Sequence, residues 1–340
     1  MKLIERIKAL SELGTQLSGW LVELEQGKET RLNPVISAAF NRNGWFTKDQ
    51  VMFSLNEIAS WLTSDQLSNW VAPYNFDKVK EAKLVGVIMA GNIPLVGFHD
   101  YLSVIISGHK LQAKLSSKDE VLLRFIHNEL LSIEPRFEEV VDFKSERFNT
   151  IEAVIATGSN NSSRYFDYYF SKIPHIIRKN RTSVAILEGN ETEDELGLLG
   201  EDIFRYFGLG CRNITKVYFP KGFDIDWFYK GIISHSEVIN NHKYSNNYDY
   251  HKSVYMLNRD EIWDNNFLLL KKDPSLSSPV GTLFYEEYED LTVLTNQLDE
   301  LNTQIQCKVG VVGHKLGDAQ KPLLTDYSDN IDVLNFLLGL

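Results

Sequence analysis

The stretch that decides the fold of this chain is Leu84-Val85-Gly86-Val87-Ile88-Met89-Ala90-Gly91-Asn92-Ile93-Pro94. Residues 84–90 form a short, unbroken apolar run, which is typical of a β-strand covered on both faces in a parallel sheet. The four residues that follow favour a turn, because glycine, asparagine and proline each suit turn backbone angles. Residues 96–107 are apolar again and predict a helix. A strand, a turn and a helix in succession form the repeating unit of an α/β protein.

The same alternation continues along the chain. Further strands of this kind are predicted over 110–115, 151–156, 183–187 and 214–219. Helices are predicted between them over 118–131, 165–170 and 193–207. This alternation indicates parallel, doubly wound sheets. Later strands are predicted over 268–270, 280–284 and 309–313, whereas 235–251, rich in Asn, His, Tyr and Ser, predicts an irregular surface loop.

The length of 340 residues predicts two domains, since one domain usually holds roughly 100–200 residues. Residues 1–80 predict amphipathic helices, one of them capped by Ser64-Asp65. We place the domain boundary between residues 181 and 182, ahead of the strand predicted over 183–187. The first domain then includes the helical N-terminal segment.

Composition excludes several classes of protein. The net charge of −11 argues against binding to nucleic acid or to an anionic membrane, which needs a basic surface. No apolar stretch approaches the roughly 20 residues that cross a bilayer, and the N-terminus lacks a secretory signal. The eight histidines show no metal-ligand spacing, so no metal is expected. These features together predict a cytoplasmic location.

Cys211 is the strongest candidate for a reactive side chain. It lies in Phe207-Gly208-Leu209-Gly210-Cys211-Arg212-Asn213, a glycine turn before the strand predicted over 214–219. The chain has only two cysteines, so a disulfide framework is not expected. A thiol on such a turn is a nucleophile candidate. The alternative is that Cys211 only fills space, as many buried free cysteines do.

Three further features follow predicted strands at their carboxyl ends, where doubly wound sheets bind ligands. They are Gly91-Asn92-Ile93-Pro94, Lys114-Leu115-Ser116-Ser117 and Thr157-Gly158-Ser159. No Gly-x-Gly-x-x-Gly follows the first strand, so the usual dinucleotide fingerprint is missing. Each feature alone has a plain structural alternative: a turn for Asn92, a surface lysine for Lys114 and a helix cap for residues 116–118.

In order and spacing, the four features resemble the aldehyde dehydrogenase superfamily, and more closely its acyl-CoA reductase branch, the LuxC-like fatty-acid reductases. The resemblance covers residues 84–220 well and 278–313 loosely, and Asn43-Gly44-Trp45-Phe46-Thr47 in the N-terminal segment is also similar. It implies an α/β fold of two doubly wound Rossmann-type domains with a helical N-terminal segment. Residues 1–181 would bind NAD(P) without the usual glycine fingerprint, and 182–340 would form the catalytic domain.

The resemblance also implies roles for single residues. Cys211 matches the catalytic nucleophile, and Asn92 matches the asparagine whose amide helps to form the oxyanion hole. Lys114 matches the lysine that contacts the adenosine ribose, with Ser116 and Ser117 beside it. Gly158 and Ser159 match the nicotinamide end of the cofactor site. The chemistry agrees, because a thiolate is the side-chain nucleophile best suited to attack a thioester.

Departures from the family pattern refine the expected reaction. Aldehyde-oxidising relatives use a glutamate to activate water, but residues 168–187 contain no Asp or Glu. This absence favours reduction of a thioester, which needs no such water. NAD-preferring relatives place an acidic residue where Ser117 stands, followed here by Lys118. Serine and lysine can accept a 2′-phosphate, so we expect NADPH, with NADH as the alternative.

We therefore predict an NADPH-dependent reductase that converts an acyl-CoA or acyl-carrier-protein thioester to an aldehyde through an acyl-Cys211 intermediate. The alternatives are an oxidising aldehyde dehydrogenase and a non-catalytic subunit that binds acyl or nucleotide ligands. Neither self-association nor membership of a larger reductase complex is decided by the sequence. The general acid is also open among His235, His242, His251 and His314. Lys172, Arg178, Lys179 and Arg181 are expected on a solvated face, with coenzyme A phosphates as their alternative partner.

Overall fold

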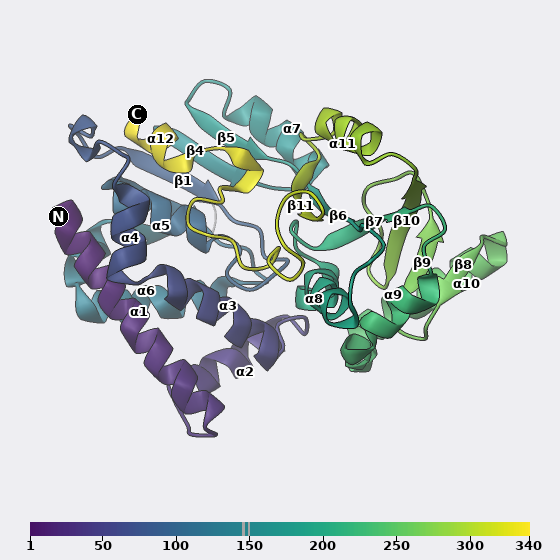
Figure 1. The fold of residues 1–340 in the computed structure, drawn as a ribbon. Helices are drawn as coiled ribbons and strands as arrows, with labels where there is room; N and C mark the ends of the chain where they lie inside the picture. The colour runs from purple at the N-terminus through teal and green to yellow at the C-terminus, as the bar shows by residue number, and fades with distance from the viewer. Residues whose placement is uncertain (145–146, 149) are drawn as a thin grey trace. The chain divides into compact units, whose positions relative to one another are not determined.

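The chain forms two compact units, which Figure 1 shows in a computed structural model. The first unit holds residues 1–180 together with 323–340, and the second holds 181–322. The structure describes residues 1–144, 147–148 and 150–340. In this described part, no helix is both long and apolar enough to cross a membrane.

Four helices open the first unit, as the amphipathic pattern predicts. They are α1 Leu3–Glu25, α2 Leu32–Arg42, α3 Lys48–Trp61 and α4 Ser64–Val71. Leu10, Leu13 and Leu17 of α1 are fully buried, because their spacing places them on one helix face. The predicted cap is one residue out of place: the side chain of Thr63 accepts the hydrogen bond from Gln66 N, and Ser64 already belongs to α4.

A parallel five-stranded sheet forms the centre of the first unit, in the order β3-β2-β1-β4-β5. Its strands are β1 Leu84–Ile88, β2 Lys110–Lys114, β3 Val141–Phe143, β4 Ala153–Thr157 and β5 His175–Arg178. The intervening helices are α5 Phe98–Ser107, α6 Glu120–Ile133 and α7 Asn160–Tyr169, with short turns η1 Phe76–Lys78 and η2 Pro135–Glu139. The predicted strands over 84–90, 110–115 and 151–156 are confirmed, whereas β3 and β5 were not predicted.

The last residues of the chain return to the first unit, although the sequence placed them in the second domain. Tyr327 accepts a hydrogen bond from Trp70 Nε1 at 2.8 Å, and its hydroxyl lies 2.8 Å from that of Tyr74. Helix α12, Val333–Leu338, packs beside α5 and buries Leu334 and Leu337 in the core of this unit (Figure 1). A short turn, η5 Ser328–Asn330, precedes it. These contacts join residues far apart in sequence, so local patterns could not predict them.

The second unit has a six-stranded sheet in the order β11-β6-β7-β10-β9-β8. Its strands are β6 Thr182–Ile186, β7 Ile214–Pro220, β8 Ile262–Asp264, β9 Leu269–Lys272, β10 Thr282–Tyr288 and β11 Ile305–Gly310. All neighbours are parallel except β8 and β9. Its helices include α8 Glu193–Phe204, α9 Ile225–Gly231 and α11 Leu291–Glu300, with turns η3 Arg205–Gly208 and η4 Ile233–Asn240. The strands predicted over 183–187 and 214–219 are confirmed.

The loop predicted over 235–251 is wrong in its second half. Residues His242–Asn258 form α10, one of the longest helices of the described chain. Asn241 caps it, because its side chain accepts hydrogen bonds from Lys243 N and Tyr244 N. Tyr244, Tyr248 and Tyr255 are buried on one face of the helix. Burial of these three tyrosines stabilises the helix. The residues between them are mostly polar, and this composition concealed the helical spacing of the tyrosines in the sequence.

Candidate active site

Cys211 is half-buried and lies just before β7, on a turn that a buried asparagine closes. Asn213 Oδ1 accepts a hydrogen bond from Gly210 N at 2.7 Å. Asn213 Nδ2 donates to the carbonyls of Asp202, Ile203 and Arg205, the last at 2.7 Å. A single amide thus holds the cysteine turn against the end of α8. The sequence prediction quoted Asn213 only as part of the turn and assigned it no role.

The backbone before Cys211 is held in an uncommon conformation. Tyr206 and Phe207 have φ angles of 54° and 57°, and Gly208 follows at 77°. Left-handed angles cost little at glycine but of order 1–3 kcal/mol at other residues. The Tyr206 and Phe207 side chains are buried, and packing of this kind offsets the cost. The cysteine turn is therefore a built feature of the second unit.

Ser183 of β6 lies between the two cysteines of the chain. Its hydroxyl donates to the Cys211 carbonyl at 3.0 Å and accepts from Cys307 N at 3.1 Å. Cys307, in β11, is only 7% exposed, whereas Cys211 is partly accessible. Burial makes a thiol inert toward reagents in solution. Of the two thiols, Cys211 is the one that can meet a substrate.

A buried carboxyl group supports the same turn from α8. Asp202 is fully buried, and its two oxygens accept hydrogen bonds from Gly317 N at 2.7 Å and Ala319 N at 3.0 Å. Arg212, next to the cysteine, donates from Nε to the Ala319 carbonyl. Burial raises the pKa of Asp202 to about 7, against the lowering effect of the two backbone donors. Asp202 and Arg212 both hold the loop 317–319, and neither was predicted.

In the first unit, the residues predicted at strand ends share the carboxyl edge of the sheet. Ile88 pairs with Lys114 of β2 and with Ala156 of β4, so the loops after these strands are neighbours. Met89 N donates to the Lys114 carbonyl at 3.0 Å. Asn92 and Lys114 are both exposed at this edge. The structure thus brings together Asn92, Lys114 and Ser159 on adjacent loops, as expected from a parallel sheet.

Gly91 lets two of these loops approach closely. A Cβ at this position would lie 2.4 Å from Ser116 Oγ, so only glycine fits. Ser116 Oγ accepts from Lys118 N at 3.3 Å, which forms a local turn. The N-cap position of α6 is Asp119 rather than any residue of 116–118, and its side chain makes no capping hydrogen bond. The exposed Ser117 therefore does not cap this helix.

Asp119 fixes the loop that carries Asn92. Its Oδ2 accepts a hydrogen bond from Leu95 N at 2.6 Å, and Leu95 has a φ angle of 59°. Ser54 Oγ donates to the Pro94 carbonyl at 2.9 Å from the other side. Burial raises the pKa of Asp119 well above its usual value. Sequence reasoning placed Asp119 in a helix turn and missed this role.

The Thr157-Gly158-Ser159 segment links the end of β4 to the start of α7. Ser159 caps α7 by accepting from Ser162 N at 3.2 Å and stays exposed. A Cβ at Gly158 would lie 2.9 Å from the Phe166 ring, so a larger residue there would require this ring to shift. Together with Lys114 and Ser117, these groups offer hydroxyl, ammonium and backbone donors along one sheet edge. This donor set fits the phosphates and riboses of a nicotinamide dinucleotide.

The acid-free stretch after α7 contains β5, and one of its four basic residues, Arg178, is buried. Arg178 is 5% exposed and binds the buried Asp100 of α5 through both guanidinium ends, at 2.5 and 2.9 Å. The expectation of a solvated or coenzyme A-binding Arg178 is thus wrong, because a buried carboxylate already occupies its donors. Arg181 donates to the Asn302 carbonyl at 3.1 Å. Lys172 and Lys179 are exposed.

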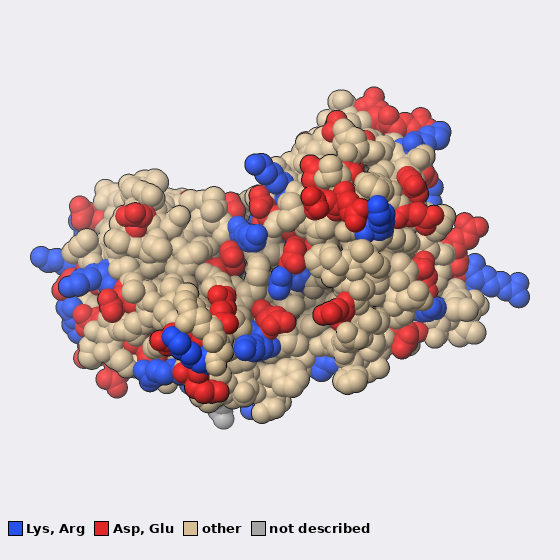
Figure 2. Space-filling view, turned by 60° about the horizontal axis from the view of Figure 1, so that its bottom comes forward, with Lys and Arg blue, Asp and Glu red and all other residues tan. Residues whose placement is uncertain are grey.

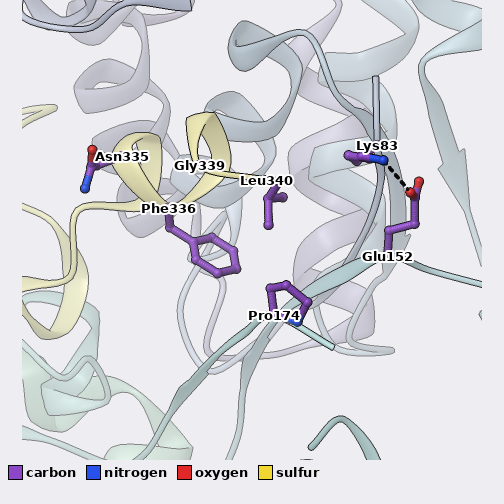
Figure 3. Close-up of a pocket in the computed structure, with 7 residues that line it drawn as sticks. All are labelled: Lys83, Glu152, Pro174, Asn335, Phe336, Gly339 and Leu340. Carbon is purple, nitrogen blue, oxygen red and sulfur yellow. Dashed lines mark ion pairs between the residues drawn. The ribbon is translucent and has the colours of Figure 1, made fainter. Parts of the chain in front are cut away.

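Apart from the carboxyl edge of the first sheet, two features of the molecule are a hollow in the first unit and the charge on its surface. A hollow of about 470 Å³ in the first unit is lined by Lys83, Glu152, Pro174 and the C-terminal residues Asn335, Phe336, Gly339 and Leu340 (Figure 3). Lys83, Glu152 and Pro174 precede β1, β4 and β5, so the hollow lies at the amino edge of the sheet, opposite the predicted residues. Figure 2 shows Asp and Glu interspersed with Lys and Arg on one face of the molecule, without a continuous basic surface.

The candidate histidines have different surroundings. His235 Nε2 lies 2.8 Å from the Gly197 carbonyl, and its ring stacks on Phe204. His242 and His251 lie on α10, and His314 follows β11. Within the described residues, no group of three or more His, Cys, Asp or Glu side chains is arranged to hold a metal ion.

No family model and no curated protein matches the sequence, but solved structures are similar in fold. Aldehyde dehydrogenase 21 from Physcomitrella patens, in complex with the reaction product succinate, has a TM-score of 0.66 at 11% identity, covering 100% of this chain and 84% of that one. A Mycobacterium tuberculosis aldehyde dehydrogenase complexed with NAD+ has a TM-score of 0.58 at 11% identity, covering 94% and 84%. An NADP-dependent glyceraldehyde-3-phosphate dehydrogenase from Bacillus halodurans, complexed with NADP, scores 0.60 at 12% identity, covering 91% and 74%. The fold is therefore aldehyde-dehydrogenase-like, as expected.

Proposed function

We propose that this protein is a nicotinamide-dependent oxidoreductase that reduces a fatty acyl thioester, on coenzyme A or acyl-carrier protein, to an aldehyde. The observation that carries the proposal is Cys211, a half-buried thiol on a turn held by Asn213, Ser183 and a left-handed backbone. A fold that fixes the backbone around one accessible thiol suits a nucleophile better than a space-filling residue. The aldehyde-dehydrogenase-like fold supports the same class of chemistry.

In the proposed reaction, the Cys211 thiolate attacks the thioester carbonyl carbon. The bond to the carrier sulfur breaks, and the carrier leaves as a thiolate that takes up a proton. The resemblance assigns the Asn92 amide as a donor to the oxyanion, and one such donor is typically worth about 3–4 kcal/mol. When held by the residues of the first unit's carboxyl edge, NADPH would supply the hydride that reduces the acyl-cysteine. The carbon–sulfur bond to Cys211 then breaks to release the aldehyde and regenerate the Cys211 thiolate.

The residues that would hold the cofactor are those of the first unit's carboxyl edge. Lys114, Ser116 and Ser117 stand at the end of β2, and Gly158 and Ser159 follow β4. NADPH is favoured over NADH because Ser117 and Lys118 are exposed and uncharged or cationic, so they do not repel a 2′-phosphate.

The second candidate function is oxidation of an aldehyde, which the names of the similar solved structures favour. That reaction needs a carboxylate to activate water for hydrolysis of the acyl-enzyme. Residues 168–187 have no Asp or Glu, and β5 within this stretch ends in Arg178. The absence of an acid from this stretch supports transfer to and from a thiol carrier over transfer to water.

The test is retention of label from a radiolabelled fatty acyl-CoA in the absence of cofactor. Wild type and Cys307→Ser should keep the label through denaturation, whereas Cys211→Ala should not. Adding NADPH should then release labelled aldehyde. The acyl-Cys211 proposal is contradicted if Cys307→Ser and Cys211→Ala both retain the label, or if neither variant retains it. Labelled fatty acid formed from aldehyde and NAD(P)+, without transfer to coenzyme A, favours the oxidising alternative.

A further inference from the structure

Arg42, in the helical N-terminal segment, contacts the carboxyl edge of the first unit's sheet. It is the last residue of α2, and its Nε donates to the Ser117 carbonyl at 2.8 Å. Its Nη2 pairs with Glu120 in the first turn of α6. The Arg42 side chain is about half-exposed, at 49%. The bond to Ser117 places this cation directly at the loop after β2.

Two ammonium groups lie on the same loop. Lys114 ends β2 and Lys118 follows Ser117, and both side chains are exposed. In the described part of the chain, neither forms an ion pair within 4.0 Å. Glu120 is the one carboxylate seen to pair with these cations there. Asp119 is buried, and its Oδ2 accepts a hydrogen bond from Leu95 N. Unpaired cations stand out in a chain of net charge −11.

We propose that Arg42 is a specificity-determining residue that binds the 2′-phosphate of NADPH, together with Lys114 and Lys118. The inference rests on the proposed function, which places the adenosine ribose beside Lys114 and Ser117. A guanidinium presents donors in a planar fork that matches a phosphate, and the ammonium groups add charge. The phosphate replaces Glu120 as the partner of Nη2, while the Nε bond to Ser117 keeps the fork in place.

A purely structural role for Arg42 predicts a different result. Arg42 would then only tie α2 to the loop, and its loss would disturb binding of both dinucleotides alike. Arg31 provides the matched control, since it lies at the start of the same helix and pairs with Glu129 of the same α6. Glu129 lies near the end of α6, whereas the loop after β2 leads into the start of that helix. Loss of Arg31 should therefore leave dinucleotide affinity unchanged.

The experiment measures dissociation constants for NADPH and NADH by the change in nicotinamide fluorescence on binding, with no acyl substrate present. Arg42→Gln should weaken NADPH binding about tenfold or more, as expected for one hydrogen bond to a charged group, and change NADH binding less than twofold. Glu120→Gln should tighten NADPH binding, because the guanidinium loses its competitor. Across the variants, the affinity for 2′,5′-ADP, measured by competition, should change in parallel with that for NADPH. The affinity for 5′-AMP should change in parallel with that for NADH. Arg31→Gln should match wild type.

Equal weakening of both dinucleotides in Arg42→Gln, or a wild type that binds NADH as tightly as NADPH, overturns this inference and leaves the nicotinamide proposal standing. A wild type that binds neither dinucleotide overturns both. Thermal unfolding of each variant shows whether a loss of affinity reflects a loss of fold.

Discussion

The carboxyl edge of the first unit and the cysteine turn of the second are built in opposite ways. At the edge, the candidate side chains Lys114, Ser117 and Ser159 are exposed and stand on strand ends. At the turn, Cys211 is positioned by Asn213 and Asp202, which are fully buried. Exposed donors can be changed with little cost to the fold, whereas a buried polar network cannot. Binding and stability should therefore respond separately to substitutions in the two regions.

The largest expected loss of stability comes from Asn213→Ala. The substitution leaves Gly210 N without its acceptor and three carbonyls without their donor. Unpaired buried groups of this kind cost about 1–3 kcal/mol each, so we expect the unfolding free energy to fall by about 3–5 kcal/mol. Denaturant unfolding measures it, and hydrogen exchange of β7 locates it. A loss below about 1 kcal/mol would show that the turn does not depend on this amide.

A pH dependence should follow from Asp202. Its pKa is raised to about 7 in the folded protein, whereas an unfolded aspartate titrates near 3.9. Because the folded state holds the proton more tightly, this group's contribution is full below about pH 4 and is lost as the pH rises to about 7. The expected decrease is about 2–4 kcal/mol. Asp202→Asn removes the titration, so the difference between wild type and variant should change over this window. A flat difference contradicts the shift.

The sequence predicted the parts of the fold that local pattern determines. The strands at 84–90, 110–115 and 214–219 were found because a continuous apolar run marks a strand buried on both faces. Strand β5 was missed because Arg178, a charge, is buried in it, and only its pairing with Asp100 explains that burial. Helix α10 was missed because three tyrosines in a polar sequence form its buried face.

In the candidate site too, some residues were predictable from local sequence pattern and others were not. Strand ends with exposed polar residues were visible in the sequence, since turn residues follow each apolar run. The partners that hold them were not. Asp119 binds Leu95, and Asp202 binds residues 317 and 319, which are far away in sequence. From the sequence alone, a buried aspartate cannot be distinguished from one on the surface, because its hydrogen-bond partners are not known.

A moderate effect is expected from Ser159→Ala at the exposed edge. Its hydroxyl accepts from Ser162 N at the start of α7, and loss of such a cap typically costs about 1 kcal/mol. Ser162→Ala is the matched control, because it keeps the backbone donor that Ser159 serves and removes only the hydroxyl that lies 3.1 Å from Ser159 Oγ. The unfolding free energies of the two variants should therefore differ by about 1 kcal/mol, with Ser159→Ala the less stable. Equal stabilities would show that the cap contributes nothing.

The smallest change in stability, with the clearest change in binding, is expected from Lys114→Met. The side chain is exposed at the carboxyl end of β2, and surface substitutions usually stay within about 0.5 kcal/mol. Lys110→Met is the matched control, since Lys110 is exposed at the amino end of the same strand. Both variants should unfold like wild type, but only Lys114→Met should raise the dissociation constant for NADPH, by about tenfold. If both lysines affected binding equally, net charge rather than position at the carboxyl edge would account for affinity, and the contrast between the exposed candidate edge and the cysteine turn with its buried support would no longer hold for binding.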